Sequence, residues 1–166
     1  MFTEAIAALL AIACSQGEIG SELLRAGYAA VPMHTSGVGH LHTEGELNGK
    51  ALEVLVDTGA SNTIIDVDLA RRLGLVLTPG PQSGAGIGAA TVPVMLVEDA
   101  VFSVHDVAVP GPIYAMDFTS LRAALQARGS AVPGAVLGGD AMRALDAVLA
   151  YRQNQLYLRR PARPQP

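Results

Sequence analysis

The amino-acid sequence predicts a mainly β domain with short helices, and three observations support this fold class. Runs rich in Val, Ile and Leu are short. Eighteen glycines and ten prolines interrupt them within 166 residues, as in short strands joined by frequent turns. The Asn-Gly pair in Leu47-Asn48-Gly49-Lys50 predicts a type I′ turn, because both central residues of that turn need a positive φ. We therefore expect a hairpin from Val38 to Asp57.

Composition limits the class of protein. At 166 residues, with half of them hydrophobic and 16% charged, the chain fits one globular domain with a sizeable core. A formal net charge of −4 provides no basic surface for nucleic acid. The single cysteine, Cys14, excludes an internal disulfide framework and a thiolate-rich zinc site. No apolar run reaches the roughly 20 residues that a transmembrane helix needs.

The N-terminal 30 residues differ from the remainder. Ala5 to Cys14 has the length of a signal-peptide core, and Leu10 to Cys14 loosely resembles a bacterial lipoprotein cleavage box. However, no Lys or Arg precedes this run, and Glu4 carries the wrong sign. We therefore divide the chain into an N-terminal helical or signal segment (1–30), a domain (31–159) and a Pro/Arg-rich tail (160–166). A cytoplasmic location is favoured over export with an anchor at Cys14.

Helix signals occur at three places. Asp66 is a predicted N-cap, with Gly74 as the stop. Asp117 or Thr119 is predicted to cap a second helix, which Gly129 closes. A third short helix follows Asp140, which we expect to be its N-cap. Further strands are predicted over the ranges Val92–Val97, Val101–Val109 (containing a structural His105), Ala147–Tyr151 and Leu156–Leu158.

One carboxylate, Asp57, lies between two apolar runs within Ala51 to Asp66. An aspartate in that setting has little nearby water and no cation beside it in sequence. Burying it alone as an anion would cost several kcal/mol or force it to take a proton. Gly59 suggests a sharp turn or the close approach of another group. The position of Asp57 is more easily explained by chemistry than by stability.

Two other motifs contain residue types that are found in binding sites. Gly84, Gly86 and Gly88 do not have the spacing of a phosphate-binding loop and run into a strand, so we interpret this segment as a hairpin tip. His40 and His42 share one face of a predicted strand, with His34 nearby, which is a possible metal-binding arrangement. No third ligand is fixed by the local pattern, so the sequence predicts no metal.

The order of these features resembles the retropepsin-like aspartic proteases from about Val38 to Arg159. The resemblance rests on Val56-Asp57-Thr58-Gly59-Ala60-Ser61, on the glycine-rich segment around Ile87, and on Val136-Leu137-Gly138-Gly139-Asp140 before a short helix. It implies a closed β-barrel-like domain with short helices and one lobe per chain. The helix around Leu121 to Leu125 is similar to an insertion found in bacterial members.

The resemblance also implies a role for each matched residue, and it implies no cofactor. Asp57 would be catalytic, Thr58 would brace the paired loops, and Gly59 would let the substrate backbone approach. The remaining matched residues would continue the active loop (Ala60, Ser61), form a flap tip (Gly86, Ile87, Gly88) and support the loop from behind (Gly138, Gly139), with Asp140 as a helix cap.

In this family two Asp-Thr-Gly loops hold the attacking water, and this chain contains one. The resemblance therefore implies a C2 homodimer acting on a peptide or protein substrate. Because the tail is rich in proline, a dimer sheet must use Leu156 to Arg159 or the N-terminal region. Two alternatives stay open: a catalytically silent dimer that acts as a peptide-binding or scaffold protein, and a metal-binding protein that uses His34, His40 and His42.

Overall fold

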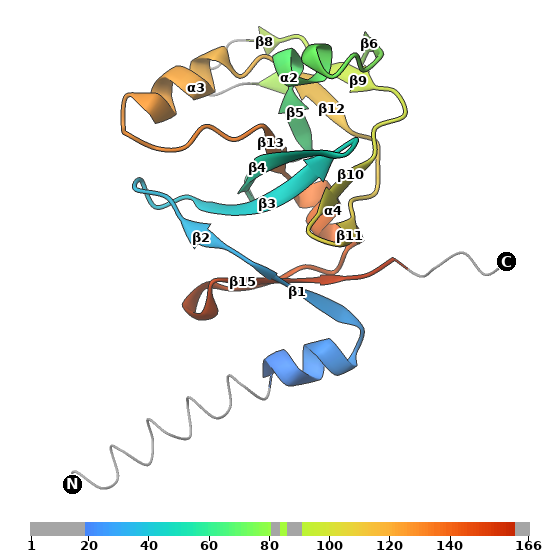
Figure 1. Ribbon diagram of the computed structural model, residues 1–166, viewed down its shortest axis with the longest axis vertical. Coiled ribbons are helices and arrows are strands. Elements are labelled where there is room, and N and C mark those ends of the chain that lie inside the picture. The colour runs from blue at the N-terminus through green and yellow to red at the C-terminus, as the bar shows by residue number, and fades with distance from the viewer. Residues whose placement is uncertain (1–18, 81–83, 86–90, 162–166) are drawn as a thin grey trace, which may run out of the picture.

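A long hairpin forms the centre of the computed structural model, which describes residues 19–80, 84–85 and 91–161 (Figure 1). Strand β3 (Leu41–Leu47) pairs antiparallel with β4 (Lys50–Val56). Asn48 and Gly49 connect them with φ values of 47° and 80°. These are the positive angles that the Asn-Gly pair predicted. The Asn48 side chain also accepts a hydrogen bond of 2.8 Å from the Val101 amide. This bond connects the turn to the residue that precedes β10 (Phe102–Val104).

The hairpin belongs to a ten-stranded sheet whose main path runs β11-β10-β3-β4-β13-β5-β12-β9-β6, with β2 paired to β3. The strands other than β3 and β4 are β2 (His34–Thr35), β5 (Ile64–Asp66), β6 (Leu77–Pro79), β9 (Met95–Val97), β10 (Phe102–Val104), β11 (Val107–Ala108), β12 (Tyr114–Met116) and β13 (Ala135–Leu137). Strand β13 lies between β4 and β5, parallel to the first and antiparallel to the second. The chain that leaves β4 must therefore pass the end of β13 before it enters β5.

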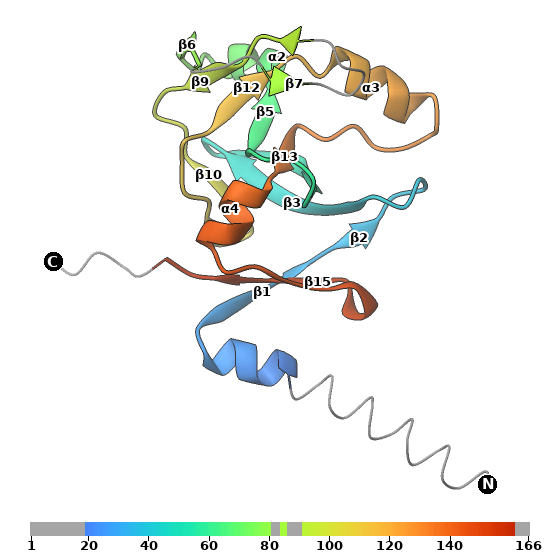
Figure 2. The same cartoon turned by 180° about the vertical axis from the view of Figure 1, so that it is seen from behind.

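A second sheet has the order β1-β15-β14, from β1 (Tyr28–Pro32), β15 (Gln155–Arg159) and β14 (Val148–Ala150). In Figures 1 and 2 this sheet lies beneath the hairpin, with α4 (Gly139–Ala144) between β13 and β15. Residues 19–25 are helical and precede β1. Within this chain both edges of β15 are already paired. In the part of the chain that the structure describes, the open edges of this sheet belong to β1 and β14.

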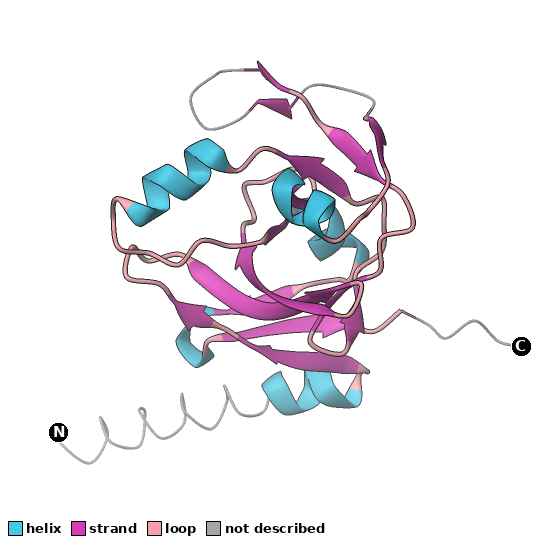
Figure 3. Ribbon diagram, turned by 45° about the horizontal axis from the view of Figure 1, so that its top comes forward, coloured by secondary structure: helices cyan, strands magenta, loops and turns pink. Residues whose placement is uncertain are grey.

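Short helices cover the sheets (Figure 3). Helix α2 (Val67–Arg72) begins at the predicted N-cap, since the Asp66 side chain accepts a hydrogen bond from the Asp68 amide. It ends at Arg72 with Leu73 as the C-cap, and the predicted stop, Gly74, follows with a φ of 71°. Asp66 is buried and forms an ion pair of 2.7 Å with Arg122 of α3 (Thr119–Gln126). Among the described residues, no helix is both long and apolar enough to cross a membrane.

The hydrophobic core fills the space between the two sheets. Its fully buried members come from both of them, for example Leu47 and Val54 of the hairpin and Leu156 of β15. A smaller cluster lies under α3 and contains Leu55, Phe118 and Val136. The core therefore depends on contacts between strands that are far apart in sequence.

Several sequence-based expectations about the fold were wrong. The predicted strand Val92–Val97 is divided between β8 (Thr91–Val92) and β9, and the N-cap of α3 is Phe118 rather than Asp117 or Thr119. The sheets do not close into a barrel. The range Val101–Val109 is two strands, β10 and β11, because the chain reverses at His105, whose φ is 50°. His105 lies exposed in this tight turn.

We expect Leu156→Ala to lower the free energy of unfolding by about 2–5 kcal/mol, because it leaves a cavity between the two sheets. Urea denaturation of the full chain measures this change. The control is Val76→Ala, at a side chain that is 63% exposed, with an expected loss below about 0.5 kcal/mol. Equal losses for the two variants would contradict the placement of β15 in the core.

Candidate active site

Asp57 lies at the first position after β4, where the chain turns away from the sheet. Its amide donates a hydrogen bond of 3.1 Å to the Leu137 carbonyl, which holds it beside the end of β13. The Ala60 amide donates one of 3.2 Å back to the Asp57 carbonyl, closing a tight turn. The carboxylate thus lies on a short loop, residues 57–62, which we name the active loop. This loop is held between the ends of two adjacent strands.

The Asp57 side chain is half-buried, and its neighbours Thr58, Gly59 and Ser61 are exposed. The expectation that this carboxylate has little nearby water is therefore wrong for a single chain. The apolar residues on either side do enter the core, as Val56 and Ile65 show. The loop between them projects from the edge of the sheet, so its polar atoms meet solvent.

Gly59 fixes the orientation of the carboxylate. Its amide donates a hydrogen bond of 2.8 Å to Asp57 Oδ1. A Cβ atom at residue 59 would lie 3.2 Å from the same oxygen, closer than most side-chain contacts allow. The absence of a side chain therefore permits the close approach that the sequence suggested. No other described residue forms a hydrogen bond with this side chain, so Oδ2 is available in the described part of the chain.

Thr63, which the sequence analysis missed, links the active loop to the short helix α4. Its amide donates to Asp140 Oδ2 (2.9 Å) and its hydroxyl donates to Asp140 Oδ1 (2.8 Å). The hydroxyl oxygen in turn accepts a hydrogen bond of 3.1 Å from the Gly138 amide. Thr63 is fully buried. A threonine directly before an apolar strand gives no sequence signal for contacts with residues 75–77 positions away.

The prediction that Asp140 caps its helix was wrong. The N-cap of α4 is Gly138, and Asp140 lies in the first turn. Its carboxylate accepts hydrogen bonds from the Ala141 amide and from both polar groups of Thr63. Asp140 therefore joins the active loop to α4, and its oxygens are engaged by these contacts rather than presented to a substrate.

Gly138 and Gly139 lie directly against the active loop. A Cβ atom at Gly138 would be 2.4 Å from the Asn62 carbonyl carbon and oxygen. The Gly139 amide donates a hydrogen bond of 2.8 Å to the Ala60 carbonyl. The paired glycines thus allow the start of α4 to support the loop from behind, because any side chain at 138 would displace the loop backbone.

An open cleft of about 480 Å³ runs from the exposed Thr58 along α4. Its other lining residues are Gly139, Met142, Arg143, Asp146, Ala147 and Leu149. This surface is mixed, with apolar side chains beside one cation and one carboxylate. Asp57 is next to the cleft but does not line it.

The predicted flap tip, Gly86, Ile87 and Gly88, lies outside the described residues, as do Cys14 and the end of the tail. The strands on either side of this segment are described. Strand β7 (Gly84–Ala85) pairs antiparallel with β8 (Thr91–Val92), with Gly84 opposite Val92.

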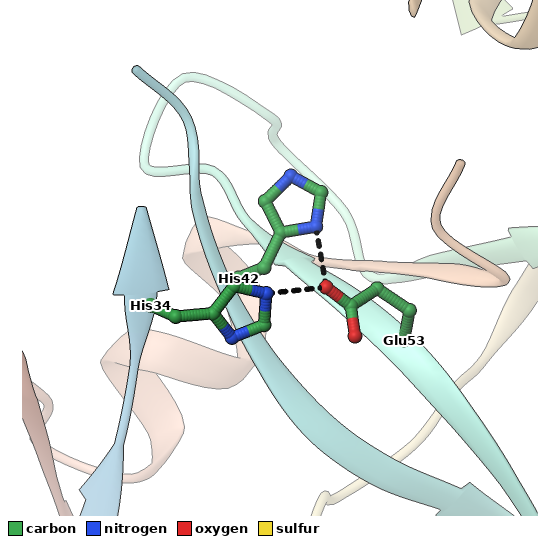
Figure 4. A group of neighbouring side chains, drawn as sticks. All are labelled: His34, His42 and Glu53. Carbon is green, nitrogen blue, oxygen red and sulfur yellow. Dashed lines mark ion pairs between the residues drawn. The ribbon is translucent and has the colours of Figure 1, made fainter. Parts of the chain in front are cut away.

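A group of possible metal ligands lies on strands β2, β3 and β4 rather than on the active loop. His34, His42 and Glu53 bring one ligand atom each to within 4.8 Å of one another (Figure 4). The sequence had pointed to His34, His40 and His42. The acidic member comes from the neighbouring strand β4, and its contact with the histidines could not be read from local spacing.

A model of the family described as aspartyl protease matches residues 43–141. The search of curated proteins found no match. Among solved structures, the retroviral protease-like domain of Ddi1 from Leishmania major is similar at a TM-score of 0.50 and 15% identity, over 72% of this chain and 87% of that one. This likeness agrees with the predicted mainly β, retropepsin-like fold.

Two further structures are similar at lower TM-scores. One is the EIAV protease complexed with the inhibitor HBY-793, with a TM-score of 0.49, 21% identity, and coverage of 66% of this chain and 90% of that one. The other is a retropepsin-like aspartic protease from Rickettsia conorii, with a TM-score of 0.44, 16% identity, and coverage of 80% and 89%.

We expect Asp140→Ala to lower the free energy of unfolding by about 2–4 kcal/mol, because it leaves the buried amide and hydroxyl of Thr63 without an acceptor. Chemical denaturation measures the loss. The matched control, Asp106→Ala, removes an exposed partner of Arg160 and should cost less than about 1 kcal/mol. An Asp140→Ala variant as stable as the control would contradict the proposed support of the loop.

Proposed function

We propose that this chain, which belongs to the aspartyl protease family, is an aspartic endopeptidase whose water is activated between Asp57 of two subunits. The observation that carries the proposal is the state of that carboxylate. Oδ1 is held by the Gly59 amide, whereas Oδ2 has no hydrogen-bond partner among the described residues. A fixed carboxylate with a free oxygen at a solvent-facing loop suits a general base.

The second carboxylate of the active site has to come from another copy of the chain. The 166 residues contain a single Asp-Thr-Gly triplet. Asp140, an acidic residue from the second half of the chain that lies beside the loop, is engaged with Thr63. A C2 dimer would bring two identical loops face to face about the symmetry axis. The exposure of Thr58 and Gly59 in one chain is compatible with their burial in such an interface.

The chemistry follows from two like charges held close together. Carboxylates about 4 Å apart repel by about 4 kcal/mol at an effective dielectric constant of 20. Ionising both is therefore unfavourable, and aspartic proteases hold one proton between the pair. The ionised Asp57 takes a proton from water as it attacks the peptide carbonyl, and the protonated copy donates to the developing oxyanion.

The remaining residues would position the reacting groups. Thr58 would hydrogen-bond across the dimer and brace the loops, while Gly59 would leave room for the substrate backbone. Gly86, Ile87 and Gly88 would close over the peptide and exclude water. The contact of Gly138 and Gly139 with the loop would keep both Asp57 carboxylates at a constant separation.

The main alternative is a dimer that binds peptides without cleaving them. The hydrogen bonds that hold the loop, such as those donated by the Gly59, Ala60 and Gly139 amides, would serve equally in a protein without catalytic turnover. The intact carboxylate favours the enzyme, because a peptide-binding surface has no evident need for an acid at residue 57.

We expect Asp57→Asn to lower the rate of peptide cleavage at about pH 4–6 by at least about 100-fold. This is the lower end of the rate enhancement that a general acid or base supplies. Asparagine keeps an oxygen for the Gly59 amide, so the fold and the dimer should persist. Asp106→Asn, at an exposed turn, is the matched control and should cleave at the wild-type rate. Wild-type protein that is dimeric but cleaves no member of a diverse peptide library across this range would rule out the enzyme.

Mixing subunits tests the shared site directly. We expect excess Asp57→Asn protein to inhibit wild-type cleavage, because a heterodimer holds one aspartate. Activity per wild-type chain should also rise with protein concentration until dimers predominate. Activity and mass measured on the same samples report both effects. A fully active monomer, or a wild-type rate unaffected by the variant after subunit exchange, would disprove the shared dyad.

A further inference from the structure

Three neighbouring strands, β2, β3 and β4, each contribute one polar side chain to the same face of the sheet. His34 of β2 lies directly opposite His42 of β3. His42 in turn lies opposite Leu55 of β4, and Glu53 is two residues before Leu55, so it projects from the same face. Strand pairing therefore brings two imidazoles and a carboxylate together.

The ligand atoms converge on one carboxylate oxygen. His34 Nε2 lies 2.8 Å from Glu53 Oε1, and His42 Nδ1 lies 3.0 Å from the same oxygen. Figure 4 shows the two rings approaching Oε1 from different sides. The ring centroids are 5.7 Å apart and the planes are inclined by 36°, so the imidazoles are not stacked.

These short contacts do not have hydrogen-bond geometry. Within the described part of the chain, both ring nitrogens of His42 and Oε1 of Glu53 lack a hydrogen-bond partner. His42 is fully buried. Leaving a buried polar group without a partner is unfavourable, which suggests that another group completes this cluster.

We propose that His34, His42 and Glu53 bind a divalent zinc-class ion through His34 Nε2, His42 Nδ1 and Glu53 Oε1. Imidazole and carboxylate are ordinary zinc ligands at about 2.0–2.2 Å, and tetrahedral ligands at such distances are about 3.3 Å apart. The contacts of 2.8 and 3.0 Å need to open by only a few tenths of an ångström. The His34 side chain is 56% exposed, so water can supply the fourth ligand.

The surrounding charge favours a cation. Glu44 is directly opposite Glu53 in the β3–β4 pairing and shares its face of the sheet. Two carboxylates in register repel each other, and a divalent ion relieves that repulsion. Imidazole ligands select zinc-class ions over Mg²⁺ and Ca²⁺, which prefer oxygen.

The proposed role of the ion is structural. Glu53 is four residues before Asp57, or about 13 Å along an extended strand, so the ion takes no part in peptide hydrolysis. It would connect β2 to β4, which do not pair with each other. Strand β2 has only two residues and two pairing partners on β3. An ion would therefore hold β2 against the β3–β4 hairpin, which carries the active loop.

Isothermal titration of the chelator-treated full chain with Zn²⁺ at about pH 7.5 tests the proposal, with the metal content after dialysis as a second measure. We expect one zinc ion per chain and a rise in thermal unfolding temperature with zinc concentration, because the ion binds the folded state. Mg²⁺ should produce neither effect. Both readouts are independent of protease activity, so failure of the proposed enzyme would not affect them.

Single-residue variants identify the ligands. His34→Gln alters an exposed side chain and Glu53→Gln keeps the shape of its side chain, so we expect both variants to fold. Thermal unfolding measured without zinc checks this expectation. Each should weaken zinc binding by at least about 10-fold, the lower end of the range for disturbing a metal site. His105→Asn is a control at an exposed turn whose positive φ asparagine tolerates. His40→Gln is a second control, at the histidine that the sequence had suggested.

Three outcomes would overturn the assignment. The first is no saturable zinc binding by the folded chain. The second is unchanged affinity in both His34→Gln and Glu53→Gln. The third is a loss in His40→Gln that exceeds the loss in Glu53→Gln, which would place the ion on the three histidines instead.

Discussion

The insertion of β13 between β4 and β5 is the constraint on which the active loop depends. Because β4 and β13 are parallel, Asp57 and Gly138 follow the same edge of the sheet. The loop that starts at Asp57 must pass over that edge to reach β5. There its backbone packs against Gly138 so closely that no other residue would fit at that position. The hydrogen bonds between Thr63 and Asp140 hold the end of the loop against α4. The position of the carboxylate is thus set by backbone packing from two distant segments.

The sequence was most informative where one local group determines the backbone. Asn48-Gly49 specified its turn, and Asp66 and Gly74 specified the ends of α2, because caps and positive-φ turns depend on residues within one helical turn or hairpin. The split of the range Val101–Val109 was missed because the turn at His105 and Asp106 contains neither glycine nor proline, the strongest turn signals. Open sheets in place of a barrel could not be foreseen, since closure depends on register between distant strands.

The site was predictable only in part. Asp57 and Gly59 stand in a contiguous motif, and a family resemblance supplied a role for them. Thr63 acts through Asp140, which is 77 residues away, and single-sequence patterns carry no information on such pairs. Glu53 was overlooked for a related reason, because it joins His34 and His42 only through strand pairing. The expected lack of water around Asp57 followed from the apolar runs beside it, but a loop can leave the core between two buried strands.

The pairing of β1 with β15 has a consequence for the order of folding. Tyr28 is opposite Arg159, so this contact joins residues that are 131 positions apart, whereas β14 and β15 are joined by a short turn. Loop-closure entropy rises with the length of the loop, and non-local pairings form slowly. We therefore expect β15 to pair first with β14 and to receive β1 late. The N-terminal strand would then be the last to join this sheet, and newly made chains would expose one edge of β15 until it arrives.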